Sequence, residues 1–293
     1  GVSVGVGDGA RGRDKSAVGR SRVCNPAACC YSHAHPTLRS ASPMNSPLPE
    51  TPQRPLASPD APHAVVIGSG FGGLAAAIRL GARGFRVTVV DKLDAPGGRA
   101  YVFRQDGFTF DAGPTIVTAP FLLRELWTMC GRRFEDDVDL RLMSPFYRIR
   151  FDDGKVFDYG GDAEAVKAEI ARFNPDDVAG YERYMQASEQ AYEIGFEKGG
   201  HLPFETFGEL LRFLPGMIHL RAYRSVYGQV AKYVRDPHVR IVLSFHPLLI
   251  GGNPFTVTSI YTLISFLERQ WGVHSAMGGT GSIIKGMVDL IRG

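Results

Sequence analysis

Three glycines and one acid carry the clearest chemical signal in this chain. Gly68, Gly70 and Gly73 follow a short apolar run at 64–67 and precede an alanine-rich stretch of helical character. A helix N-terminus offers unpaired N–H groups and a positive dipole end, and glycines let a phosphate and a strand come close to it. Asp91 ends a second apolar run, 18 residues after Gly73, where a carboxylate can accept hydrogen bonds from ribose hydroxyls. The pattern predicts a βαβ unit that binds a dinucleotide.

A second glycine-rich loop follows six residues later and ends in an arginine, Gly97-Gly98-Arg99. A planar guanidinium suits two oxygens of one pyrophosphate. The pattern up to Asp91 fits NAD as well as FAD, and the arginine loop favours FAD. The alternative is that Arg99 is ion-paired on a surface loop.

Several longer stretches in order carry a family resemblance: GSGFGGLAAAIRLGARG, DKLDAPGGRAY, FDAGPTIVT, SPFYRI, GKVFDY, FNPDDVAGYERY, SFHPLLIGGNPF and WGVHSAMGGTGSIIKGM. From about residue 63 to 293 the chain resembles the bacterial phytoene desaturases, which are FAD-dependent carotenoid desaturases of the amine-oxidase-like superfamily. The fold class expected from the resemblance is α/β, a Rossmann-like βαβ FAD-binding domain with an inserted α+β substrate and membrane domain.

The resemblance also assigns residues to the cofactor. It implies that the ADP half of FAD is held by Gly68, Gly70, Gly73, Asp91, Gly98 and Arg99. It places Gly113, Pro114 and Thr115 close to the flavin ring. The superfamily usually has glutamate where this chain has Asp91, and aspartate keeps the charge with a shorter reach.

The activity implied by the resemblance is desaturation of 15-cis-phytoene to neurosporene or lycopene. Each new double bond removes two electrons and two protons, so the flavin is the expected electron acceptor and a quinone or oxygen the terminal one. Glu209 and Arg212, spaced i,i+3 in an apolar stretch, are candidates to take the proton and to steady the charge; the alternative is an intrahelical surface ion pair. His246 is expected to be structural.

Other functions stay open at this point. A C30 desaturase, a carotenoid isomerase or a ketolase would look similar in sequence. A non-enzymatic, escort-like isoprenoid binder and a soluble NAD-dependent dehydrogenase are further alternatives, and the Gly97–Arg99 loop argues against both.

Residues 204–234 mix aromatic and aliphatic side chains with basic ones, as expected of a helix in a lipid interface. The alternative is an ordinary amphipathic core helix. No stretch reaches the length of a membrane span. With the resemblance, we expect a monotopic protein on the cytoplasmic side of a membrane, with a long-chain polyene as substrate.

The chain divides into four predicted parts. Residues 1–62 form a disordered tail, in which 1–43 is expected to be translated upstream sequence before Met44; 63–140 begin the FAD domain; 141–272 form the substrate and membrane domain; 273–293 return to the FAD domain. Within these parts we expect helices at 122–129, 162–172, 177–195 and after 279, and a hairpin of strands 143–151 and 155–159.

Composition excludes some functions. The net charge of +3 lies in residues 1–60, so no basic surface for nucleic acid is expected. Cys24, Cys29 and Cys30 match no standard zinc spacing, and no metal site is expected. The chain is expected to be truncated at its C-terminus, because the second half of the family's length is absent. Alone, it is expected to fold poorly and lose FAD.

Overall fold

The computed structural model describes residues 4–5, 58–200, 202 and 205–293. Most of the predicted tail, including Met44 and the three tail cysteines, lies outside the described residues. Val4–Gly5 is an exception to the predicted disorder, because these residues form strand β1 and pair in parallel with β3.

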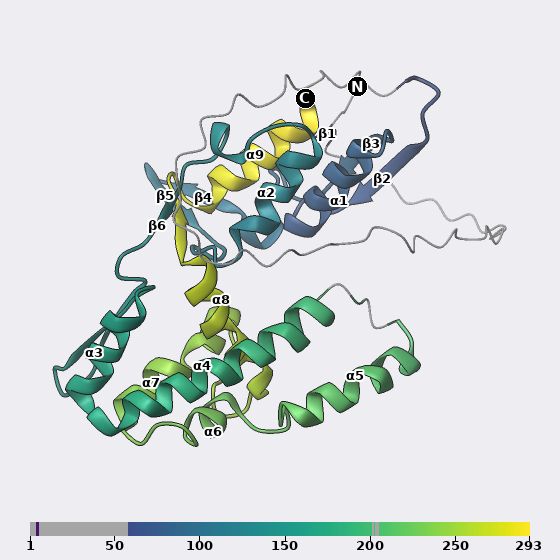
Figure 1. Cartoon of the computed structure of the whole chain (residues 1–293). Coiled ribbons are helices and arrows are strands. Elements are labelled where there is room, and N and C mark those ends of the chain that lie inside the picture. The colour runs from purple at the N-terminus through teal and green to yellow at the C-terminus, as the bar shows by residue number, and fades with distance from the viewer. Residues whose placement is uncertain (1–3, 6–57, 201, 203–204) are drawn as a thin grey trace, which may run out of the picture.

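The first unit is a short parallel sheet covered on one side by helices (Figure 1). Strand β2 (His63–Ile67) pairs in parallel with β3 (Arg86–Val90), Val65 opposite Thr88, and helix α1 (Phe71–Ala82) connects them. This is the predicted βαβ unit. The remaining elements of the unit are η1 (Gly98–Ala100), β4 (Val102–Gln105), β5 (Phe108–Asp111), α2 (Pro120–Met129), η2 (Phe134–Asp136) and α9 (Thr280–Arg292).

The core of the first unit lies around α1. Leu74 and Ile78 pack with Trp127 of α2 and Met287 of α9, all at most 2 % exposed, while Ala77 packs on β3. The opposite face of β2 is uncovered by the described residues, since Val65 is 58 % and Ile67 87 % exposed.

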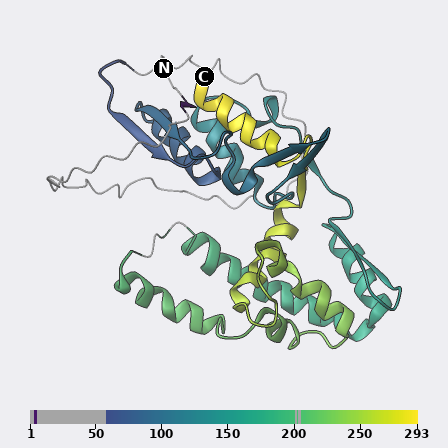
Figure 2. The same cartoon turned by 180° about the vertical axis from the view of Figure 1, so that it is seen from behind.

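The second unit contains the middle of the chain and lies below the first in Figures 1 and 2. Its hydrophobic core includes Phe157, Ile170, Tyr184 and Leu243, each fully buried. Its elements are β7 (Tyr147–Arg150), β8 (Val156–Tyr159), α3 (Ala163–Phe173), η3 (Pro175–Asp177), α4 (Val178–Tyr192), the π-helix η4 (Glu193–Lys198), α5 (Phe207–His219), α6 (Val226–Val230), α7 (Pro237–Ser244), η5 (His246–Ile250), η6 (Ser259–Thr262) and α8 (Leu263–Trp271).

The expected local elements are confirmed with shifted ends. The hairpin β7–β8 turns at Gly154, whose φ of 85° favours glycine, and Tyr147 pairs with Tyr159. Its first strand begins at Tyr147 rather than 143, because Pro145 has no N–H for a ladder. Helix α4 ends at Tyr192, where the π-helix η4 replaces the last turn expected up to 195.

Two strands connect the units. Strand β6 (Leu140–Leu142) leaves the first unit and pairs antiparallel with β9 (His274–Ala276), which leads back to α9. This pair lies at the predicted boundaries near 140 and 272, and the division into domains stays a prediction. In the part of the chain that the structure describes, no helix is both long and apolar enough to cross a membrane.

Candidate functional site

The glycine-rich turn connects β2 to α1 through close backbone contacts. Gly68 has a φ of 103° and its N–H donates to the carbonyl of Val90 (2.7 Å). A Cβ on Gly73 would lie 1.8 Å from the Gly68 carbonyl oxygen, so only glycine lets the helix start this close to the turn. Helix α1 begins after Gly70 with no side-chain cap and no acid in its first turn. Its N-terminal N–H groups and positive dipole end are therefore available to an anion.

Asp91 stands at the end of β3 and is bound to the same turn. Its Oδ2 accepts hydrogen bonds from the N–H (2.6 Å) and hydroxyl (2.7 Å) of Ser69, and its Oδ1 accepts the N–H of Leu93 (2.9 Å). The Leu93 N–H and then the two Ser69 donors lower the pKa of Asp91 to about 2, because they stabilise the charged form. The side chain predicted to bind ribose is thus ionised and held beside the glycine-rich turn. The role of Ser69 was not foreseen, although its small donor side chain between two glycines was a readable signal.

The arginine loop packs directly on the glycine-rich turn. The Gly97 N–H donates to the carbonyl of Ser69 (2.9 Å), and a Cβ on Gly98 would lie 3.1 Å from the Cα of Gly70. Arg99 is exposed, and its guanidinium makes no ion pair or hydrogen bond with the residues that the structure describes. The described residues thus offer no support for the alternative of an ion-paired surface arginine, and the role of Arg99 stays a prediction.

These groups fit the phosphates and ribose of a dinucleotide. Helix α1 begins beside Gly70, the Asp91 carboxylate is bonded to the neighbouring Ser69, and the loop that carries Arg99 packs on the same turn through Gly98. A Cβ on Gly70 would make only ordinary contacts, 3.8 Å from the Gly97 carbonyl oxygen. The protein itself therefore does not require glycine at position 70, whereas close approach of a phosphate does.

The loop from Asp111 to Thr115 lies against the arginine loop. A Cβ on Gly113 would lie 2.7 Å from the carbonyl oxygen of Arg99 and 2.8 Å from the Cα of Ala100, so packing on this turn requires glycine. Pro114 and Thr115 are exposed. All the predicted cofactor-binding residues thus lie in one part of the first unit, and their contacts with FAD stay predictions.

Glu209 and Arg212 lie apart from this group, on α5 of the second unit. Glu209 closes a capping box with Thr206: the Thr206 N–H donates to Glu209 Oε2 (3.2 Å) and the Glu209 N–H to Thr206 Oγ1 (3.3 Å). Arg212 is exposed and makes no ion pair with Glu209. The alternative of an intrahelical ion pair is therefore wrong. The Thr-x-x-Glu spacing before an apolar run was the signal for the cap.

A buried polar cluster in the second unit was missed from sequence. The fully buried Glu268 accepts hydrogen bonds from the hydroxyl of Tyr147 (2.6 Å) and pairs with Nε2 of His246 (3.0 Å), which is 1 % exposed. Burial and the neighbouring carboxylate raise the pKa of Tyr147, which keeps its proton on the hydroxyl. The cluster joins β7, η5 and α8, in agreement with the structural role expected for His246.

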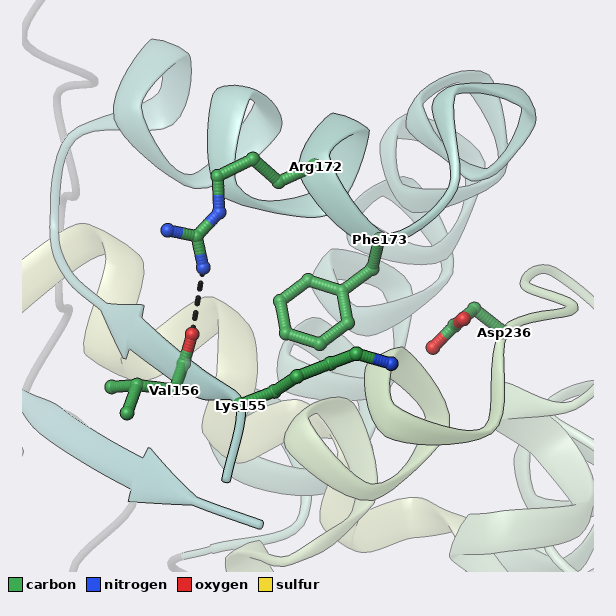
Figure 3. Close-up of a pocket in the computed structure, with 5 residues that line it drawn as sticks. All are labelled: Lys155, Val156, Arg172, Phe173 and Asp236. Atoms are coloured by element: carbon green, nitrogen blue, oxygen red, sulfur yellow. Dashed lines mark hydrogen bonds between the residues drawn. The ribbon is translucent and has the colours of Figure 1, made fainter. Parts of the chain in front are cut away.

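A cavity of about 290 Å³ lies in the second unit, away from the glycine-rich turn (Figure 3). It is lined by Lys155, Val156, Arg172, Phe173 and Asp236. Arg172 donates to the carbonyl of Val156 (2.7 Å), as the dashed line shows. Its charged lining does not suit a hydrocarbon, and no predicted site residue lines it. No group of side chains able to hold a metal occurs in the described ranges.

A parallel βαβ unit with an uncapped helix, an acid at the second strand end and an exposed arginine on the neighbouring loop is typical of a dinucleotide-binding protein. The family described as flavin containing amine oxidoreductase matches residues 71–293. The chain belongs to this family, which confirms the expected fold class and FAD as the cofactor.

Curated relatives agree with this family. The chain is 52 % identical to the neurosporene-forming phytoene desaturase of Cereibacter sphaeroides, over 80 % of this chain and 45 % of the relative. It is 49 % identical to the lycopene-forming phytoene desaturase of a Paracoccus species, over 80 % of this chain and 47 % of that relative. The chain thus spans about half the length of these curated relatives.

Solved structures agree on the fold. A Pyrococcus furiosus protein matches with a TM-score of 0.50 and 20 % identity, over 78 % of this chain and 49 % of that chain. An engineered triple mutant of putrescine oxidase matches with a TM-score of 0.51 and 17 % identity, over 79 % of this chain and 49 % of that chain.

Proposed function

We propose that this chain belongs to an FAD-dependent phytoene desaturase that forms neurosporene or lycopene. The observation that carries the proposal is the 49–52 % identity to relatives of both names across 80 % of the chain. The α1 N-terminus, Asp91 and the loop of Arg99 all lie at one glycine-rich turn, which supports the proposal because a pyrophosphate and a ribose need these groups. When bound, FAD supplies the two-electron acceptor that no side chain provides.

We also propose a membrane location, on the cytoplasmic side, and an exposed apolar stripe on α5 supports the contact with a membrane. Five residues at helical spacing form the stripe and are 45–74 % exposed: Phe207, Leu210, Leu211, Leu214 and Ile218. On another side of α5, a Cβ on Gly199 would lie 2.7 Å from the ring of Phe213 and one on Gly216 2.9 Å from Ile194, so that side packs on η4. A helix that packs on one side and exposes apolar residues on another suits a lipid interface, from which a polyene can be drawn.

For catalysis we propose that Glu209 takes the proton released in desaturation and that Arg212 steadies the developing charge. Glu209→Gln keeps a residue that can close the capping box, so it is expected to leave the melting temperature unchanged while turnover falls. Thr206→Ala is the matched control: it removes the cap, at a cost of about 1 kcal/mol, and leaves turnover per folded molecule unchanged. Equal turnover of Glu209→Gln and the wild type would remove Glu209 from the reaction.

The proposed function is tested by expressing the complete polypeptide in phytoene-producing cells and identifying the product by chromatography. Neurosporene or lycopene is the expected product, with phytoene consumed. The purified protein should be yellow and reduced by substrate, and a quinone or oxygen should reoxidise it. Unchanged phytoene together with a colourless protein would contradict the proposal.

A further inference from the structure

The segment that returns from the second unit lies against the loop expected to face the flavin. Strand β9 exchanges two hydrogen bonds with the far end of that loop: His274 N–H donates to Val117 O (2.9 Å), and Val117 N–H donates to His274 O (2.8 Å). The loop 111–117 is therefore anchored at its C-terminal end by a strand distant in sequence.

The start of α9 anchors the other end of the same loop. The Thr280 N–H donates to Asp111 Oδ2 (3.1 Å), and the Thr280 hydroxyl donates to the carbonyl of Pro114 (2.5 Å). Thr280 is 4 % exposed. Its two donors thus hold both the carboxylate that starts the loop and the backbone in its middle.

The approach of this turn to Asp111 requires glycine at position 279. Gly279 has a φ of 80°, and a Cβ there would lie 2.0 Å from Asp111 Oδ2. The other carboxylate oxygen, Oδ1, is buried and has no hydrogen-bond partner in the described part of the chain. The carboxyl group of Asp111 therefore lies at the N-terminus of α9, where the helix dipole favours an acidic side chain.

We propose that Thr280 and Asp111 are positioning residues, which fix the backbone of Gly113, Pro114 and Thr115 in the shape that accepts the flavin. The inference rests on the proposed flavin site. The loop is held on two sides: Gly113 packs against Arg99 and Ala100, and Thr280 holds the Pro114 carbonyl. Pro114 and Thr115 remain exposed, and hence free to meet a cofactor.

The test compares Thr280→Val with Ser282→Ala in the complete polypeptide. Thr280→Val keeps the side-chain shape and the N–H to Asp111 but removes the bond to Pro114. Ser282→Ala removes a hydroxyl from the same turn. That hydroxyl donates to Gly279 O (2.8 Å) and makes no hydrogen bond with the loop 111–117. The readouts are FAD affinity by titration, the visible circular dichroism of bound flavin, and the melting temperature without FAD.

We expect Thr280→Val to weaken FAD binding about 3- to 10-fold and to alter the flavin dichroism, as the loss of one buried hydrogen bond predicts. Thr280→Ser should restore both, and Ser282→Ala should lower only the melting temperature. Wild-type affinity and dichroism in Thr280→Val, or an equal loss in Ser282→Ala, would overturn the inference. Should Thr280→Val not fold, Asp111→Asn, of the same size, replaces it in the same comparison. A wild type that binds no FAD would instead refute the proposed function.

Discussion

Gly73→Ala tests the strand–turn–helix geometry most sharply. The added Cβ would lie 1.8 Å from the Gly68 carbonyl oxygen, and this oxygen is backbone that cannot rotate away. The start of α1 must therefore move off the turn, and forced overpacking costs about 1–3 kcal/mol. The same displacement moves the N-terminal N–H groups from the phosphate position, so FAD affinity should fall with stability.

Gly81→Ala on the same helix is the matched control. A Cβ on Gly81 meets nothing within 4 Å, and alanine is favoured over glycine in a helix by about 1 kcal/mol. We therefore expect the two variants to differ by about 2–4 kcal/mol in the free energy of unfolding. Urea unfolding followed by circular dichroism, with FAD titration beside it, measures both effects in the complete polypeptide. Equal stability and equal FAD affinity of the two variants would refute the geometry of the turn.

Four further predictions concern charge and surface. Because the pKa of Asp91 is about 2, FAD affinity should not vary between about pH 5 and 8. The stability that the ionised carboxylate contributes should be lost only as the pH falls from near 3.8 towards 2. A change in FAD affinity near pH 6 that is absent in Asp91→Asn would contradict this prediction. Arg99→Ala should weaken FAD binding about 10- to 100-fold by titration with an unchanged melting temperature, since the exposed side chain bonds to no residue in the described ranges; unchanged affinity would exclude it from the site. Leu214→Glu should reduce flotation with anionic vesicles at least about tenfold, whereas Ile241→Glu, at an equally exposed apolar site, should not. Equal flotation of the two variants would count against membrane contact through the α5 stripe. Burial lowers the pKa of His274 below its ordinary value of 6.5, so as the pH falls the unfolded state binds a proton before the folded state does. The free energy of unfolding should therefore decrease below about pH 6.5. His274→Gln should reduce this pH dependence.

Local patterns in the sequence were sufficient for the βαβ unit. Glycine spacing, an apolar run on each side and an acid at the second strand end each reflect a backbone requirement that acts within 30 residues. The hairpin at Gly154 was readable for the same reason. The arginine loop was predicted by its composition, whereas its packing on the turn at Ser69 and Gly70 depends on a contact between two separate loops.

Contacts between distant segments could not be predicted. The pairing of Glu268 with His246 and Tyr147 joins residues up to 121 positions apart, and the bond from Thr280 to Asp111 joins residues 169 apart. Nothing in the local pattern of either residue indicates such a partner. The cap formed by Glu209 follows from the Thr-x-x-Glu spacing with Thr206, which is a local pattern and was predictable.

We propose that the turn at Gly68–Gly73, together with Asp91 and Arg99, binds the pyrophosphate and ribose of FAD. Calorimetric titration of the complete apoprotein with FAD, repeated in the presence of excess ADP, tests it most directly. We expect one site that ADP occupies competitively and that Arg99→Ala weakens. Binding of FAD that is indifferent to both ADP and Arg99→Ala, or no binding at all, would contradict it.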